Sequence, residues 1–183
     1  MAKYKLTEFK DRYAGRPAAI LGGGETMPAE LKRVPVDSVL FAVNYHGLHY
    51  ADCDFMVYND TPDTNPLQAQ AVAEHKTIHI SPDPSTDVEL DEKVWTGFYS
   101  SHTAIWVAAY MGCNPIILCG HDLYTRAVKH CPPSTYHSTQ FDQPLDFHLR
   151  PWLEDAKNML PHPERIRAMS GPLVQLFGAY QPS

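Results

Sequence analysis

Short apolar runs recur along the chain, and residues that favour turns stand at both ends of each run. The runs are Ala18–Leu21, Val39–Val43, Phe55–Tyr58, Thr77–Ile80, Pro115–Cys119 and Ile166–Ala168. Short β-prone runs between Asn, Asp, Gly, Pro or Ser are typical of strands. We therefore predict that these runs are strands of one sheet.

Helical patterns lie between and beside the apolar runs. We predict helices over Leu6–Tyr13, Met27–Lys32, Leu67–His75, Ser100–Met111, Pro151–Met159 and Gly171–Phe177. The pattern is clearest in the fourth helix, where serines are N-cap candidates and Gly112 ends the helix. Pro151 suits the first turn of the next helix. Strands that alternate with helices indicate βαβ units, so we predict an α/β fold with a parallel sheet.

The segment from Gly120 to Arg150 breaks this alternation. It is rich in His, Pro, Tyr, Asp and Gln and has no regular period. A long irregular segment in a small domain is usually functional. We predict a long loop or lid over about 120–150.

The length of the chain and its charge narrow the range of functions. A chain of 183 residues fits one domain with a sizeable core, and we predict a single domain over residues 1–183. The formal net charge is −6, and no run of Lys or Arg stands out. Because binding to a nucleic-acid backbone needs a basic surface, we expect no nucleic-acid partner. A nucleotide or a small polar metabolite is the expected ligand.

The cysteines and the first residues predict where the protein acts. The four cysteines form no C-x-x-C pair, and two of them flank an apolar run, where cysteine behaves as a small hydrophobe. We interpret them as reduced thiols of a cytoplasmic protein. The first twelve residues are charged throughout, and no apolar run approaches the length of a membrane span. We therefore expect neither a signal peptide nor a membrane span.

Three glycines follow the first predicted strand directly. The segment Pro17–Thr26 reads P-A-A-I-L-G-G-G-E-T, with Gly22, Gly23 and Gly24 between the strand and a hydroxyl residue. Glycine allows sharp turns and lets backbone N–H groups approach a phosphate or ribose, and the dipole of a following helix favours an anion. The run is neither the G-x-G-x-x-G fingerprint nor a Walker A loop. It predicts a nucleotide site, with a tight turn that binds nothing as the alternative.

Polar residues or glycine follow the other strands as well. In an open parallel sheet, ligands bind beyond the carboxyl ends of the strands. The candidates there are Gly22, Gly23, Gly24 and Thr26, then Asn44 and Tyr45, then Asn59 and Asp60, then Gly120, His121, Asp122 and Tyr124. An asparagine amide offers both a donor and an acceptor to a base or ribose. Asn and Asp also end strands simply because they make good turns.

The start of the clearest helix offers a second place for an anion. Ser100 and Ser101 bring hydroxyls and free backbone N–H groups to this helix start, although both could be caps and nothing more. Asp122 could orient a ribose, bind a metal attached to a phosphate, or cap the next turn.

Histidines are concentrated in the irregular segment. They are His121, His130, His137 and His148. The close ligand pairs of a structural zinc site are missing, so we expect no bound metal. A single histidine that acts as an acid or base fits better. Our candidate for the catalytic base is His148, in D-F-H-L-R-P-W.

Four motifs together carry a family resemblance. They are I-L-G-G-G-E-T-M, F-A-V-N-Y, M-V-Y-N-D and S-S-H-T-A-I-W-V-A-A-Y-M-G-C-N-P-I-I-L-C-G-H-D-L-Y. Over about Leu6–Phe177 the chain resembles the family 42 bacterial sialyltransferases. It also resembles proteins described as 6-hydroxymethylpterin diphosphokinase-like, which are common in bacterial glycan loci and phage genomes.

The sialyltransferase resemblance implies a fold and a chemistry. It implies a Rossmann-like, mostly parallel sheet with helices on both faces, a lid over the donor, and a nucleotide-sugar bound without metal or other cofactor. A glycan or small-molecule acceptor would be activated by His148, which lid closure would bring into place. The residues implied in the nucleotide site are Gly22, Gly23, Gly24, Thr26, Asn44, Asn59, Ser101, Asp122 and Tyr124. The strand ends add Asp60 and Gly120, and the helix start adds Ser100.

The chain departs from both families at a few positions. Phe98 or Tyr99 stands where the sialyltransferases carry an arginine, so the resemblance provides no group for the carboxylate of sialic acid. The pterin kinase resemblance implies Mg²⁺-dependent pyrophosphoryl transfer, for which Asp60 and Asp63 are the available carboxylates. A non-catalytic nucleotide-binding module is a third possibility, and a homo-oligomer in which a partner subunit completes the site stays open.

Overall fold

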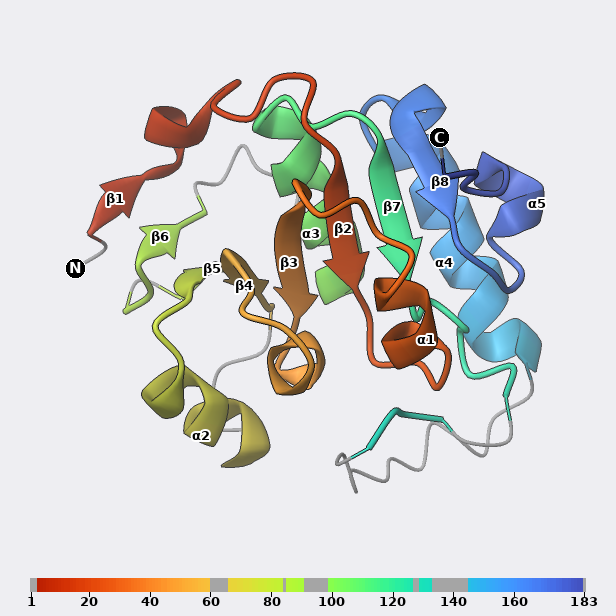
Figure 1. Ribbon diagram of the computed structural model, residues 1–183, viewed down its shortest axis with the longest axis horizontal. Coiled ribbons are helices and arrows are strands. Elements are labelled where there is room, and N and C mark those ends of the chain that lie inside the picture. Colours follow the sequence, from red (N-terminus) through yellow and green to blue (C-terminus); the bar gives the residue numbers. More distant parts are fainter. Residues whose placement is uncertain are drawn as a thin grey trace.

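The structure is a computed structural model that describes residues 3–59, 66–83, 85–90, 99–126, 129–132 and 145–182. Within these residues, eight parallel strands form one sheet in the order β1-β6-β5-β4-β3-β2-β7-β8 (Figure 1). The strands are β1 (Tyr4–Lys5), β2 (Ala18–Leu21), β3 (Val39–Val43), β4 (Phe55–Val57), β5 (Ile78–Ser81), β6 (Val88–Glu89), β7 (Ile116–Cys119) and β8 (Ile166–Ala168).

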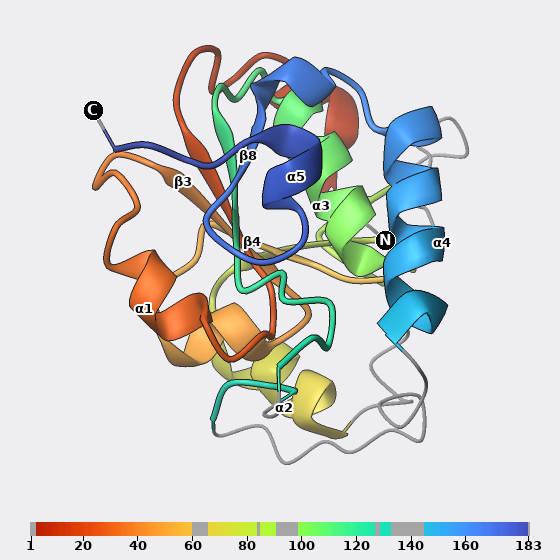
Figure 2. The same ribbon diagram turned by 90° about the vertical axis from the view of Figure 1, so that its right-hand side faces the viewer.

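Helices cover both faces of the sheet. They are η1 (Leu6–Phe9), α1 (Met27–Leu31), η2 (His46–His49), α2 (Pro66–Glu74), α3 (Ser100–Tyr110), α4 (Leu145–Met159), η5 (Pro163–Arg165) and α5 (Val174–Phe177). Figure 2 shows α1 on one side of the sheet and α3 with α4 on the other. This arrangement confirms the predicted α/β fold with a parallel sheet and helices on both faces.

The core consists of two apolar layers, one on each face of the sheet. Alternate residues of β2 divide between them: Ala18 and Ile20 pack with α3 and α4, whereas Ala19 and Leu21 pack with α1 and η2. All four side chains are fully buried. Because successive side chains of a strand point to opposite faces, a central strand with helices on both faces must be apolar throughout.

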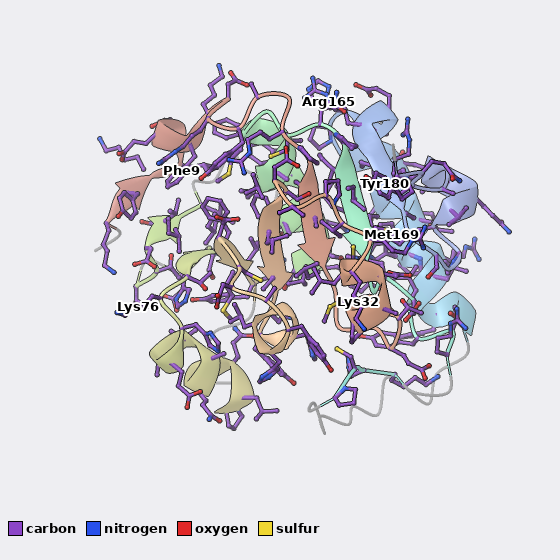
Figure 3. The ribbon with its side chains drawn as sticks, viewed as in Figure 1. Phe9, Lys32, Lys76, Arg165, Met169 and Tyr180 are labelled. Carbon is purple, nitrogen blue, oxygen red and sulfur yellow. The ribbon has the colours of Figure 1, made fainter. Side chains whose placement is uncertain are left out.

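The sheet joins distant parts of the chain. Ala18 of β2 pairs with Val39 on one side and with Ile116 of β7 on the other. Phe9 lies toward the β1 edge, whereas Met169 and Tyr180 lie toward the β8 edge (Figure 3). Past that edge, Ala168 makes an isolated parallel bridge to Ala179.

Most predicted elements are confirmed within three residues, but two are wrong. The first predicted helix is only the short η1, and the chain turns away where Asp11 takes a left-handed φ of 54°. Helix α4 begins at Leu145, six residues before the predicted start at Pro151, so the predicted loop over 120–150 is wrong at its end. A proline inside a helix removes one hydrogen bond, and burial of the next residue, Trp152, offsets that loss.

Two further features concern the helices and the cysteines. Among the described residues, no helix is long and apolar enough to span a bilayer. All four cysteines are buried free thiols, as predicted. Burial raises the pKa of Cys53 and of Cys113 to about 12, which keeps both thiols protonated and unreactive at neutral pH.

Candidate functional site

A cleft lies where the winding of the sheet reverses. From β2 the chain proceeds through β3, β4 and β5 to β6, and then crosses back to β7 on the other side of β2. Such a reversal is where open α/β sheets bind ligands, beyond the carboxyl ends of the strands. The cleft is lined by Gly22, Gly23, Gly24, Val43, Asn44, His46, Tyr99, Ser100, Ser101, Gly120, His121, Asp122, Leu123, Tyr124, Lys129, His130 and Trp152.

The volume of the cleft is about 140 Å³. This is close to the size of an engineered cavity that binds benzene. It is below the several hundred cubic ångströms usual for a whole small-molecule ligand. The cleft can therefore enclose one ring, such as a base or a ribose, while the rest of a larger ligand lies on its open side.

The glycine loop, Gly22 to Gly24, is required by close packing. A Cβ on Gly22 would lie 2.6 Å from the carbonyl oxygen of Gly120, and a Cβ on Gly24 would lie 2.5 Å from that same oxygen. The backbones meet there because Gly24 N–H donates to Gly120 at 2.9 Å. Gly120 itself has a left-handed φ of 65°. The loop thus needs the absence of side chains at Gly22 and Gly24.

Two buried carboxylates tie α1 to the segment after β7. Thr26, at the N-cap of α1, donates its N–H to Asp122 Oδ2 at 3.1 Å and its hydroxyl to Oδ1 at 3.0 Å. In the other direction, Glu30 Oε2 accepts the N–H of Gly120 at 2.7 Å, and Glu30 Oε1 accepts the hydroxyl of Ser170. We call this set the α1 clamp. The anion at the start of α1 is therefore the protein's own Asp122.

Asn44 is the residue of the cleft whose amide is available to a ligand. It follows β3 with a left-handed φ of 55°, a conformation that asparagine tolerates better than most residues. Its backbone N–H donates to Val57 at 2.9 Å. Its side-chain Oδ1 is buried and accepts no hydrogen bond from the described residues. A buried acceptor without a partner is costly, so this atom is a candidate for a ligand contact.

The other predicted asparagine holds helix α3 in place. Asn59 donates its N–H to Ser100 Oγ at 3.1 Å, and its Oδ1 accepts the hydroxyl of Thr103 at 2.9 Å. It thus joins β4 to the start of α3 behind the cleft wall. Ser101 Oγ accepts the indole N–H of Trp152 at 3.1 Å, which attaches α4 to the same turn.

The serines that were predicted as N-cap candidates stand inside the first turn of α3. Tyr99 is the N-cap, in extended conformation, and the hydroxyls of Ser100 and Ser101 bond to Asn59 and Trp152 instead. The first backbone N–H groups of an α-helix have no acceptor within the helix. This end of α3 therefore presents a positive dipole end to the cleft, as the sequence predicted.

Two stacked imidazoles cover the middle of the glycine loop. The rings of His46 and His130 lie parallel at 4.7 Å, and a Cβ on Gly23 would approach both within 2.9 Å. His130 Nδ1 lies 3.3 Å from the carbonyl oxygen of Gly23, which also accepts the N–H of Cys131 at 2.8 Å. Burial lowers the pKa of His46 to about 3, with further lowering from His130, so His46 is neutral.

His121 stands on the other side of the glycine loop. Its Nδ1 lies 3.0 Å from the carbonyl oxygen of Cys119. Since a carbonyl only accepts, Nδ1 carries the proton and Nε2 has the free lone pair. Nε2 is buried and bonds to none of the described residues. Burial lowers the pKa of His121 to about 4, against weaker raising effects from Cys119 and Asp122.

The cleft carries little net charge. Its described lining holds one carboxylate, the clamped Asp122, and one amine, Lys129, which donates to the carbonyl of Tyr124 at 2.9 Å. Leu123 and Tyr124 both have left-handed φ, of 48° and 62°. Strained backbone of this kind is frequent at ligand sites.

The structure brings together most of the predicted site residues. Lining the cleft are Gly22, Gly23, Gly24, Asn44, Ser100, Ser101, Gly120, Asp122 and Tyr124. Thr26 lies in the α1 clamp and Asn59 behind the wall. Asp60, and Asp63 on which the magnesium alternative depends, lie outside the described residues. His148 falls within α4 and not in a loop before a helix, which corrects that prediction, and its side chain is outside the described part.

Several lining residues went unpredicted, and His46, Lys129 and Trp152 are examples. His46 comes two positions after Asn44, and extending the strand-end rule by one turn would have found it. Lys129 and Trp152 are far from any strand end, and no local signal marks them. Both enter the cleft through tertiary packing alone.

Comparison with known proteins adds a fold-level likeness. No protein-family model and no curated protein matches the sequence. Among solved structures, the chain is similar to the sialyltransferase CstII from Campylobacter jejuni in complex with a substrate analogue, cytidine-5′-monophosphate. The TM-score is 0.60 at 13% identity, over 92% of this chain and 86% of that one.

A second solved structure gives the same result. The sialyltransferase CST-II in complex with a trisaccharide acceptor and CMP has a TM-score of 0.55 at 14% identity, over 91% of this chain and 87% of that one. At such identities the likeness establishes a shared fold.

Proposed function

We propose that this chain is a glycosyltransferase that uses a nucleotide-activated sugar and binds the nucleotide in the cleft beside β2. The observation that carries the proposal is the buried Oδ1 of Asn44, which bonds to none of the described residues and lies in a cleft at the reversal of the sheet. The shared fold with CstII, whose structure was determined with CMP, supports a cytidine nucleotide as the first probe.

The roles of the predicted residues follow from their positions. Asn44 binds the base or ribose, and the glycine loop and the start of α3 approach the sugar-phosphate part. Asp122 and Thr26 act indirectly, because their polar atoms bond to each other. Asp60 and His148 keep their predicted roles as nucleotide contact and catalytic base. Because the described lining offers only the clamped Asp122 as a carboxylate, we propose that the nucleotide binds without metal.

The first test measures nucleotide binding. In Asn44→Gly the side chain is lost while the left-handed backbone is tolerated. We expect wild-type protein to bind CMP with or without EDTA, and the variant to bind at least about tenfold more weakly by isothermal titration calorimetry, since a buried bond is lost.

The matched control is Asn158→Ala, at an exposed position of α4 away from the cleft. Its CMP affinity should equal that of wild type. If wild-type protein binds CMP but Asn44→Gly binds equally well, the cleft is the wrong site. No binding of any nucleotide by wild-type protein would contradict the proposed function itself.

A further inference from the structure

Three buried polar atoms of cleft-lining residues bond to none of the described residues. They are Asn44 Oδ1, His46 Nδ1 and His121 Nε2. His46 and His121 expose only 7% and 8% of their surface. Native proteins leave few buried polar atoms unpaired, and each such atom calls for an explanation. Three such atoms in one cleft indicate a ligand that forms the missing hydrogen bonds.

Asn44 Oδ1 is an amide oxygen and therefore an acceptor, and the structure shows that His121 Nε2 is an acceptor as well. The contact from Nδ1 to the carbonyl of Cys119 places the proton on Nδ1, so Nε2 can only accept. Its partner must be a hydrogen-bond donor. Cε1, the ring atom next to Nε2, lies 3.2 Å from where a Cβ on Gly22 would stand, so this edge of the ring borders the glycine loop.

We propose that His121 is a ligand-binding residue whose Nε2 accepts a hydrogen bond from a hydroxyl or amino group of the bound nucleotide. The inference rests on the proposed function and adds to it a residue and a ligand group. The pKa of about 4 distinguishes recognition from catalysis. A general base works best when its pKa is near the operating pH, so this imidazole accepts a hydrogen bond and leaves the proton on the ligand.

The distance between strand ends indicates how long the ligand must be. Asn44 follows β3 and His121 follows β7, with β2 and its glycine loop between them. Neighbouring strands are about 4.8 Å apart, so the two residues stand at strand ends roughly 10 Å apart. A nucleoside spans such a distance. We infer that one end of the nucleoside contacts Asn44 and that the other end donates to His121.

The test uses two substitutions at His121 and one matched control. His121→Phe keeps a ring of similar size and removes Nε2, while the carbonyl of Cys119 keeps its bond from Gly22 N–H at 2.8 Å. His121→Gln restores an acceptor. The control is His79→Phe in β5. His79 is also 8% exposed and its Nε2 bonds to none of the described residues, but it does not line the cleft.

Calorimetry with CMP gives the main result. We expect His121→Phe to bind CMP at least about tenfold more weakly, His121→Gln to recover most of the affinity, and His79→Phe to match wild type. UMP and 2′-deoxy-CMP identify the donor. The ligand group that donates to His121 is identified by two results. Its removal weakens binding to wild-type protein, and its removal does not weaken binding to His121→Phe any further.

A measurement on wild-type protein does not depend on how the variants fold. In the ¹⁵N spectrum of the imidazoles, the Nε2 resonance of His121 should move toward that of a hydrogen-bonded acceptor when CMP is added. Wild-type binding of CMP with an unmoved resonance, or with full affinity in His121→Phe, would overturn the inference and leave the proposed function intact. If wild-type protein binds none of CMP, UMP, AMP and GMP, both fail.

Discussion

Neutral buried histidines are the most unusual residues of this chain. Burial lowers the pKa of His46 to about 3 and the pKa values of His102 and His121 to about 4. In the unfolded chain, by contrast, each histidine titrates near pH 6.5. Below that pH the unfolded state binds protons that the folded state does not. Stability must therefore fall as the pH falls from about 6.5 toward 4.

The pH dependence of stability tests this directly. Between pH 7.5 and pH 5.5 each of the three histidines should cost about 1 kcal/mol, so we expect a loss of roughly 3 to 4 kcal/mol in the free energy of unfolding by urea denaturation. His46→Gln should reduce that loss by about one third. A stability that is flat over this range would show that these imidazoles are not held neutral.

At the scale of elements, the α1 clamp decides where the glycine loop lies. Helix α1 has only five residues, too few to hold its own position by helix formation. Carboxylates on both partners bond to backbone N–H groups of the other, Asp122 to Thr26 and Glu30 to Gly120. Bonds to a charged group are about twice as strong as neutral ones. The clamp therefore holds α1 and the glycine loop in place against the segment after β7.

We expect Asp122→Ala to lower the free energy of unfolding by about 2 to 3 kcal/mol, because two donors of Thr26 lose their acceptor inside the protein. Chemical denaturation measures this loss. Asp52→Ala, at an exposed carboxylate, is the control and should change stability by less than about 0.5 kcal/mol. An equal effect of the two substitutions would mean that the clamp contributes nothing.

The sequence predicts a strand or helix well when its pattern of apolar residues is long enough to recognise. The runs that became β2, β3 and β7 were recognisable because buried central strands are apolar throughout. Strands β1 and β6 have two residues each and carry no period. The early start of α4 was missed because a proline rule was preferred to the apolar spacing of Leu145, Leu149, Trp152, Leu153 and Ala156.

The site could be predicted only in part, for a related reason. The strand-end rule correctly predicted that Asn44 and the glycine loop line one cleft, because parallel strands end at one edge of the sheet. It could not show that Asp122 bonds to Thr26, or that Asn59 faces α3. Those pairings depend on tertiary distances that no local pattern encodes.

At the scale of the whole molecule, one aromatic cluster joins the first residues to the sheet. Phe55 of β4 stacks on Phe41 of β3 at 4.9 Å and meets the edges of Phe9 and Tyr13 at 5.8 and 6.0 Å. Phe55 is fully buried. Since the strands form one continuous sheet, damage at this cluster should reach the cleft.

We expect Phe55→Ala to lower the free energy of unfolding by about 3 to 5 kcal/mol, and Phe55→Leu to lower it much less. Far-UV circular dichroism and tryptophan fluorescence should report the same shifted midpoint, because Trp106 of α3 and Trp152 of α4 unfold together with the sheet. Two separate transitions would contradict the predicted single domain.

The pairing of β2 with β7 also bears on how the protein is made. During synthesis, β2 cannot pair with β7 until Ile116 has been made, about a hundred residues after Ala18. At a translation rate of about 5 to 20 residues per second, the wait is roughly 5 to 20 s. During that time a fully apolar strand has one open edge on the ribosome. The nascent chain is thus a natural client for a chaperone that shields β2, and a synonymous codon change that slows translation before residue 116 should increase aggregation.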